Sequence, residues 1–187
     1  MYVTEYETNL IGKLTLGADE HGLTGSWFNN DRYYLTGINE PLERADNLPI
    51  FKQAFEWLDR YFAKEKPSPA ELPLVPRGTT FQQSVWKALE AIPYGKVVTY
   101  GDIAAEVSHM QGKRTSARAV GGAVGRNPLC VIVPCHRVIG ASGSLTGFGG
   151  GIPSKLALLE HEGIDTSRFR IPTKGTALEG KENQLPW

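Results

Sequence analysis

Four prolines within ten residues constrain this chain more than any other feature of its sequence. Pro67, Pro69, Pro73 and Pro76 lie in the segment KPSPAELPLVP, between two regions rich in apolar residues. Proline lacks a backbone N–H and restricts its own φ angle, so this segment is typical of a stiff, extended connector. We therefore expect the 187 residues to form two domains, joined by a linker at residues 67–79.

The region before the linker, residues 1–66, has the pattern of a small sheet covered by a helix. Residues 11–16 alternate apolar and polar side chains, residues 17–22 are typical of a turn, and residues 23–28 resume the apolar pattern. This order predicts an antiparallel hairpin. Residues 49–64 place apolar side chains on one helical face and predict a helix. We find no cluster of catalytic residue types in this region.

Short helices are expected after the linker. Thr80 is in the position to cap a helix that begins at Phe81 and ends before the Pro-Tyr-Gly sequence at residues 93–95. Thr99 is followed three residues later by an acidic residue, which is a variant of the capping box and predicts a second helix over residues 100–108.

A third helix is expected over residues 116–124, capped by Thr115. Two short helices joined by a turn fit a helix-turn-helix, and their spacing fits a small helical bundle equally well. The distribution of charge along the chain favours the helix-turn-helix. The chain has 20 basic and 20 acidic residues, but residues 1–79 hold 8 basic and 12 acidic ones, whereas residues 80–170 hold 10 and 6. The excess positive charge in the helical region suits a module that faces DNA.

The two cysteines, Cys130 and Cys135, lie in and just after one apolar run. Residues 129–133, LCVIV, predict a short buried strand that stops at the proline after it. Cys135 would then be presented at the strand end, followed directly by a histidine and an arginine that lower the pKa of its thiol. A thiolate is a nucleophile, so Cys135 is a candidate for covalent chemistry. Cys130, inside the run, is expected to be an inert core residue.

A glycine-rich loop and a helix follow the cysteine region. The loop at residues 140–151 lacks the Lys-Ser/Thr pair of a phosphate-binding loop, but its apolar residues favour an ordered pocket wall. Pro153 is expected to start a helix that ends with Glu162. A carboxylate is unfavourable at a helix C-terminus, so Glu162 either faces water or has a partner such as His136.

No targeting or metal signal is visible. The N-terminus lacks the basic and apolar regions of a signal peptide, and no apolar run is long enough to span a membrane. Two cysteines without a C-x-x-C pair support neither a disulfide framework nor a zinc site. We therefore expect a cytoplasmic protein with free thiols and no metal.

The residues around Cys135 resemble a known signature. Pro134-Cys-His-Arg-Val138 is similar to the active-site sequence of the 6-O-alkylguanine-DNA alkyltransferases, the methylated-DNA–protein-cysteine methyltransferases. The resemblance covers residues 80–165, whereas residues 1–79 resemble only the variable N-terminal domain of that family. Further motifs in the family's order and spacing are RAVGGA at 118–123, RNP at 126–128, TGFGG at 146–150 and HEG at 161–163.

The resemblance implies DNA repair by direct damage reversal, without a cofactor. Cys135 would take the alkyl group from 6-O-methylguanine, and from 4-O-methylthymine, in one irreversible displacement. His136 would act as the base through a water, and Glu162 would hold His136 in the required tautomer. Asn127 would orient the turn around the cysteine, and Tyr100 would hydrogen-bond the departing guanine.

The resemblance also implies how the substrate is bound. The target base is buried in the duplex, so it would be flipped out through the minor groove, and Arg118 would fill the gap. Gly149 is smaller than the serine or alanine of some relatives, so we expect a pocket that admits alkyl groups larger than methyl. The pocket would be lined by Val138, Phe148, Gly149 and Gly150. The helix that contacts DNA would use Ala117, Arg118, Ala119 and Gly121.

We therefore expect an α+β monomer that binds double-stranded DNA containing alkylated guanine. We expect an N-terminal ribonuclease-H-like domain with an antiparallel sheet and a helix at 1–66, the linker at 67–79, and a mainly helical, winged-helix-like catalytic domain at 80–166. A tail at 167–187 follows, with no assigned role. The alternatives are a non-enzymatic binder of alkylated DNA, a transcription regulator with the same helix-turn-helix, and a cysteine hydrolase.

Overall fold

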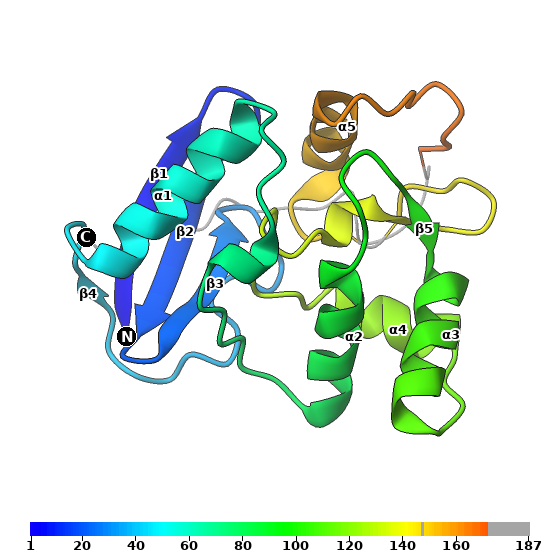
Figure 1. Ribbon diagram of the computed structural model, residues 1–187, viewed down its shortest axis with the longest axis horizontal. Coiled ribbons are helices and arrows are strands. Elements are labelled where there is room, and N and C mark those ends of the chain that lie inside the picture. The colour runs from blue at the N-terminus through cyan, green and yellow to red at the C-terminus, as the bar shows by residue number, and fades with distance from the viewer. Residues whose placement is uncertain (147, 172–187) are drawn as a thin grey trace.

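The N-terminal half is a four-stranded sheet with one helix across it. The computed structural model describes residues 1–146 and 148–171, and the sheet lies on the left of Figure 1. The strand order is β3-β2-β1-β4, in which β1 pairs antiparallel with β2 and parallel with β4, and β2 pairs antiparallel with β3. The strands are β1 (Tyr2–Thr8), β2 (Gly12–Asp19), β3 (Gly22–Phe28) and β4 (Glu43–Arg44).

The hairpin and the helix expected in this half are confirmed. Strands β2 and β3 form the hairpin, with a bulge between Gly17 and Ala18. Helix α1 (Pro49–Phe62) begins at the proline and buries its apolar face against the sheet. It ends two residues earlier than expected, because the chain turns there and Lys64 adopts a left-handed φ of 64°.

The proline-rich linker follows the edge of the sheet. Its only helical turn is η1 (Pro69–Glu71), and Ser68 caps that turn with a capping box. The Leu23 N–H donates to the Pro73 carbonyl, and the Val75 N–H donates to the Leu23 carbonyl. The linker is therefore held against β3 by backbone hydrogen bonds.

The C-terminal half is built on three short helices that pack on one another, at the lower right of Figure 1. The α3–turn–α4 unit is the expected helix-turn-helix, and the buried faces of all three helices belong to one hydrophobic cluster. The Trp86 indole N–H donates to the Ala123 carbonyl and ties α2 to α4. These helices are α2 (Thr80–Glu90), α3 (Tyr100–Gln111) and α4 (Ala117–Val124).

The helix caps are confirmed at one position and shifted by one residue at two others. Thr99 caps α3, and its capping box with Asp102 is complete. For α2 the cap is Thr79 rather than Thr80, and for α4 it is Ser116 rather than Thr115. In both cases the adjacent hydroxyl residue accepts the hydrogen bond from the backbone N–H three residues on, which is what defines a cap.

The strand expected at residues 129–133 is not formed. Leu129 makes one isolated bridge to Ser26 of β3, and Val131 then adopts a left-handed φ of 72°. The Val133 N–H turns back to donate to the Leu129 carbonyl at 2.8 Å. A β-branched residue with positive φ cannot continue a strand, so the apolar run is buried as a compact turn.

The remaining elements close the second half. A 3-10 turn η2 (Cys135–Arg137) leads into β6 (Val138–Ile139), which pairs in parallel with β5 (Val98–Thr99). Helix α5 (Gly151–His161) begins two residues before the expected proline and ends one residue before Glu162. The first residues of the expected tail pair with the preceding loop, since the Arg170 N–H donates to the Gly143 carbonyl. The rest of that tail, residues 172–187, lies outside the described residues.

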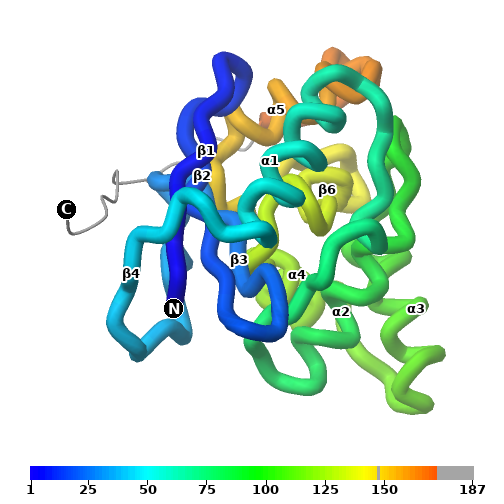
Figure 2. The backbone as a smooth tube through the Cα atoms, turned by 60° about the vertical axis from the view of Figure 1, so that its left-hand side comes forward, coloured from blue at the N-terminus to red at the C-terminus, as the bar shows by residue number. Residues whose placement is uncertain are grey.

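The two halves share one hydrophobic core. Figure 2 shows the sheet on one side and α2, α3 and α4 on the other, with α1 facing the helical half. One continuous cluster of buried residues runs from the sheet and α1 through α2, α3 and α4 to the turn that carries Cys135. The Ser26 N–H donates to the Pro128 carbonyl and the Cys130 N–H donates to the Ser26 carbonyl, so β3 directly supports the segment that precedes the cysteine.

Candidate active site

Cys135 is the first residue of η2 and is buried beneath the surface, with 4% of its area exposed. It is held by the compact turn that replaces the expected strand. The Asn127 side chain donates to the Val133 carbonyl at 2.9 Å and accepts from the Leu129 N–H at 3.0 Å. Asn127 therefore spans this turn from both ends and fixes the backbone that presents the thiol.

The pKa of the Cys135 thiol is lowered, and the groups that lower it are not its sequence neighbours. The largest contribution is a hydrogen bond from the Cys130 thiol, followed by one from the Asn127 side chain and by the positive charge of Lys155. Together these outweigh burial, which raises the pKa of the thiol. The adjacent histidine and arginine, which were expected to lower this pKa, are not among the groups that do so, because both side chains turn toward Glu162.

Cys130 is buried, as expected for a core residue, but it is not isolated. Its Sγ lies 3.8 Å from Oδ2 of Asp31 and 3.7 Å from the Asn127 carbonyl oxygen. The hydrogen bond to Cys135 is the largest influence on its own pKa, which is raised well above the usual value. Cys130 thus stays protonated, and it is the neighbour that lowers the pKa of Cys135 most.

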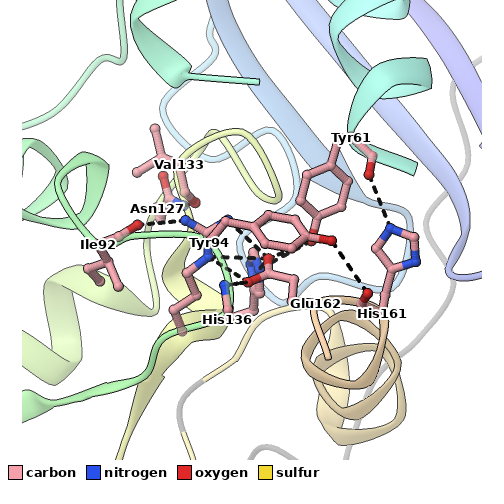
Figure 3. A network of polar contacts seen from close by, with 10 residues as sticks. Tyr61, Ile92, Tyr94, Asn127, Val133, His136, His161 and Glu162 are labelled. Carbon is pink, nitrogen blue, oxygen red and sulfur yellow. Dashed lines mark hydrogen bonds and ion pairs between the residues drawn. The ribbon is translucent and has the colours of Figure 1, made fainter. Parts of the chain in front are cut away.

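His136 and Glu162 form a buried pair, shown in Figure 3. The imidazole Nε2 lies 2.7 Å from Oε1 of Glu162, and neither side chain is exposed. Burial lowers the pKa of His136 and outweighs the opposite effect of Glu162. With Nε2 donating to the carboxylate, Nδ1 is the lone-pair nitrogen, and it has no hydrogen-bond partner within the described part of the chain. The pair therefore supplies a neutral imidazole with a free basic nitrogen.

Glu162 is the centre of a larger network. Arg137 donates from Nε to Oε2 at 2.9 Å and from Nη2 to Oε1 at 3.0 Å, and the Gly95 N–H donates to Oε2 at 3.0 Å. Burial raises the pKa of this carboxyl, but the hydrogen bonds from His136 and Arg137 and the charge of Arg137 together bring it well below its usual value. Glu162 is therefore a carboxylate at neutral pH, and it has the partner that its helix-terminal position required.

Tyr100 and Lys155 meet at one wall of the site. The Tyr100 hydroxyl donates to the Thr146 carbonyl at 2.6 Å, and Lys155 Nζ donates to the Val138 carbonyl at 2.5 Å and to the Thr146 carbonyl at 3.2 Å. Burial raises the pKa of Tyr100 to about 12 and lowers the pKa of Lys155 to about 8. The fully buried Lys155 thus ties the glycine-rich loop to the backbone of β6.

The loop segment of Phe148, Gly149 and Gly150 packs against the N-terminal half. Phe148 contacts the Phe28 ring edge to face at 5.4 Å between centroids. A Cβ at Gly149 would lie 2.3 Å from the Asp31 carboxylate, and one at Gly150 would lie 2.5 Å from the Phe28 ring. The lack of a side chain at Gly149 therefore serves the contact between the two halves, and the range of accepted alkyl groups stays a prediction.

The residues expected to contact DNA lie on α4. Ala117, Arg118 and Ala119 are exposed at its N-terminal end, and Gly121 is partly buried. A Cβ at Gly121 would lie 3.8 Å from the Tyr100 ring, so this helix borders the wall of the site. Its exposed side chains are small apart from Arg118, which allows a close approach to a nucleic-acid surface.

Sequence reasoning missed three residues that the fold brings to the site. Tyr61 of α1 donates a hydrogen bond to Glu162, and its sequence context indicated only a packing aromatic. Cys130 was assigned to the core alone. Lys155 could have been found, because it follows Ile152 by three residues and precedes Leu158 by three, on the buried face of α5.

Neither a metal site nor a membrane-spanning helix is found in the part of the chain that the structure describes. Among residues 1–146 and 148–171, no group of three His, Cys, Asp or Glu side chains is placed to hold a metal ion. Within the same residues, no helix has the length and apolar character that a membrane span requires.

Comparisons with known proteins agree over nearly the whole chain. Residues 80–164 match the DNA-binding domain of 6-O-methylguanine DNA methyltransferase, and residues 1–76 match the ribonuclease-like domain of the same family. The chain is 39% identical over 164 residues to the methylated-DNA–protein-cysteine methyltransferase of Haemophilus influenzae, which covers 88% of this chain and 87% of that protein. It is 44% identical over 163 residues to the enzyme of that name from Methanosarcina acetivorans, which covers 87% and 99%.

Solved structures give the same relationship. The crystal structure of Mycobacterium tuberculosis OGT in complex with DNA superposes with a TM-score of 0.75 at 43% identity, over 90% of this chain and 95% of that one. The O6-methylguanine-DNA methyltransferase from the archaeon Pyrococcus kodakaraensis superposes with a TM-score of 0.60 at 26% identity, over 87% and 99%.

Proposed function

The chain belongs to the 6-O-methylguanine DNA methyltransferase family. We therefore propose that Cys135 is the residue that accepts the alkyl group. The activity is that of a methylated-DNA–protein-cysteine S-methyltransferase, which repairs DNA by direct reversal of alkylation. The reaction consumes the protein, since the thioether formed on the cysteine does not revert to a thiol. One substrate is therefore repaired per chain.

The observation that carries the proposal is the buried His136–Glu162 pair beside a thiol of lowered pKa. Glu162 holds the proton of His136 on Nε2, so Nδ1 can accept the thiol proton through a water. The Cys130 thiol and the Lys155 charge then stabilise the thiolate that remains. These groups form an activated nucleophile with an oriented base.

The displacement itself needs no cofactor. The thiolate attacks the alkyl carbon, the S–C bond forms as the C–O6 bond of guanine breaks, and the electron pair stays on the base. The base takes up a proton from solvent to become guanine. The Tyr100 hydroxyl, whose pKa of about 12 keeps it protonated, hydrogen-bonds a ring nitrogen of the departing base. In the free protein this hydroxyl donates to the Thr146 carbonyl, so entry of the base exchanges one acceptor for another.

Burial of the thiol determines how DNA must bind. Because Cys135 is 4% exposed, a guanine in an intact duplex cannot reach it, and the base must be flipped out of the stack. Exposed Arg118 on α4 fills the gap, and the small residues beside it let the helix enter the minor groove. The pocket is lined by Val138 and by the Phe148–Gly150 loop. All these groups belong to one chain, so we propose a monomer that recognises alkylated guanine, and alkylated thymine, in duplex DNA.

Intact-mass measurement tests the assignment. The protein is mixed with a duplex that contains one 6-O-methylguanine, and peptide mapping locates any added mass. We expect one methyl-sized gain per chain on Cys135 and none in Cys135→Ala. Cys130→Ala is the matched control and should still gain the methyl group, more slowly. A methyl group on any other residue, or stable binding of the duplex without transfer, would contradict the proposal and favour a non-enzymatic binder.

A further inference from the structure

The N-terminal half contributes one side chain directly to the His136–Glu162 pair. Tyr61, one residue before the end of α1, places its hydroxyl 2.7 Å from Oε1 of Glu162 and 3.4 Å from Nε2 of His136. Figure 3 shows its ring entering from α1 and reaching the carboxylate, on the side of the network where His161 lies. Tyr61 is 1% exposed, so this contact is shielded from water.

The position of the Tyr61 ring is fixed from several sides. The ring is stacked on Trp57 with centroids 5.8 Å apart and meets the Tyr94 ring edge to face at 6.0 Å. The Tyr61 carbonyl accepts a hydrogen bond from Nε2 of His161 at 3.1 Å, which ties the end of α1 to the end of α5. A ring held in this way can keep its hydroxyl in one place, which a surface tyrosine cannot.

We propose that Tyr61 is a positioning residue for the transfer reaction, which holds Oε1 of Glu162 against Nε2 of His136 and shares the negative charge of that oxygen. The inference rests on the proposed function, because it assigns Tyr61 a role only if His136 is the base. It also assigns a task to the N-terminal half, which otherwise has no residue in the reaction.

The direction of the effect follows from the charges. Burial raises the pKa of the Tyr61 phenol, and the Glu162 charge raises it further, so the hydroxyl is a permanent donor at neutral pH. A hydrogen bond to Oε1 weakens the attraction of that oxygen for a protonated imidazole. Removing the hydroxyl therefore makes His136 easier to protonate, and a protonated His136 cannot act as the base. The titratable or charged groups that face the pair are Tyr61 on α1, Tyr94 before β5, Arg137 on η2 and Lys155 on α5, and His161 on α5 contacts Tyr61 from behind.

The test is the pH dependence of single-turnover methyl transfer in Tyr61→Phe. We expect the acidic limb of the rate profile to move to higher pH by about half a unit to one unit, since a neighbouring hydrogen bond changes a pKa by that order. On the acidic limb, below the pKa in both proteins, the transfer rate should fall about three- to tenfold, and well above it the rate should approach that of the unmodified protein. Affinity for the duplex, measured by fluorescence anisotropy, should not change.

Tyr6→Phe is the matched control. The Tyr6 hydroxyl also donates to a carboxylate, Oδ1 of Asp59 at 2.8 Å, and Asp59 lies on the same helix as Tyr61. This variant deletes the same atom and the same type of hydrogen bond, away from Glu162. Its pH profile should coincide with that of the unmodified protein. If the profile of Tyr61→Phe also coincides with it, Tyr61 has only a structural role and the inference is overturned.

A second variant keeps the test informative if Tyr61→Phe does not fold. A fluorinated tyrosine at position 61 retains the hydroxyl and makes it a stronger donor, so the acidic limb should move in the opposite direction, to lower pH. A shift to higher pH, or no shift, would contradict the inference. If the unmodified protein itself transfers no methyl group to Cys135, the proposed function fails. If it does, and neither variant shifts the limb, the role of Tyr61 alone is refuted.

Discussion

Replacing the Glu162 carboxylate with an amide of the same shape should cost more stability than any surface change. In Glu162→Gln the side chain keeps its volume but loses its charge and presents an N–H₂ group to a site that holds only donors: His136, Arg137, Tyr61 and the Gly95 N–H. The cation of Arg137, 7% exposed, is left without its anion. Removing one partner of a buried ion pair costs about 3–5 kcal/mol.

That loss is large compared with the stability of an ordinary domain, about 5–15 kcal/mol in total. It can be measured by urea denaturation at neutral pH, followed by tryptophan fluorescence. Glu160→Gln is the matched control, because Glu160 is exposed in the same turn of α5 and, among the described residues, its carboxylate accepts a hydrogen bond only from Thr166 Oγ1. A surface substitution of this kind should change the free energy of unfolding by less than about 0.5 kcal/mol.

The pH dependence of stability supplies a second readout. The pKa of Glu162 is below its ordinary value of 4.5 in the folded protein, so the unfolded chain binds the proton more readily. The contribution of Glu162 to the free energy of unfolding is therefore complete above the ordinary pKa of 4.5, and it is lost as the pH falls toward the lower pKa of the folded protein. The difference between the unmodified protein and Glu162→Gln should narrow as the pH falls below about 4.

A double variant tests whether the unpaired charge of Arg137 is the cause of this loss. In Glu162→Gln with Arg137→Met the buried cation is absent as well, so the double variant should be more stable than Glu162→Gln alone. If Glu162→Gln loses less than about 1 kcal/mol, or if the double variant is no more stable than the single one, then the cost of an unpaired buried charge is not what holds this network together.

Three further outcomes are expected. Cys130→Ala should raise the pKa of Cys135, which the pH dependence of its alkylation by iodoacetamide would show, and an unchanged profile would rule out the thiol–thiol hydrogen bond. Gly150→Ala should destabilise the protein by about 1–3 kcal/mol, because the added carbon meets the Phe28 ring, and a thermal melt equal to that of the unmodified protein would contradict this contact. Arg118→Ala should weaken duplex binding and reduce its salt dependence, measured by anisotropy, and equal binding at all salt concentrations would exclude Arg118 from the interface.

Sequence patterns predicted those elements of the fold that are determined by residues close together in the chain. The hairpin at residues 11–28 and the helix at 49–62 follow from alternation and helical periodicity, and the Thr99 cap follows from a hydroxyl and a carboxylate three residues apart. The other two caps were each assigned one residue away, late for α2 and early for α4, because adjacent hydroxyl residues offer the same chemistry and only the backbone path selects between them.

The apolar run at 129–133 shows where a local pattern fails. Its composition is that of a strand, but the Asn127 side chain bonds both ends of the segment, and Val131 takes a left-handed φ. Burial explains the apolar side chains equally well in a strand and in a turn. The hydrogen bonds of Asn127, two residues upstream of the run, select the turn over the strand. The pattern of apolar residues in the sequence does not indicate these hydrogen bonds.

The proline-rich segment, the reactive-cysteine motif and the separation of charge between the halves are properties of the sequence alone. They were sufficient to predict two domains, a nucleophilic Cys135 and a DNA-binding helical half. Only the tertiary structure decided what surrounds the nucleophile. His136 and Arg137 turn to Glu162, whereas Cys130 and Lys155 stabilise the thiolate and Tyr61 reaches Glu162 from the other half. Electrostatic influence depends on distance through space and on burial, and neither follows from order along the chain.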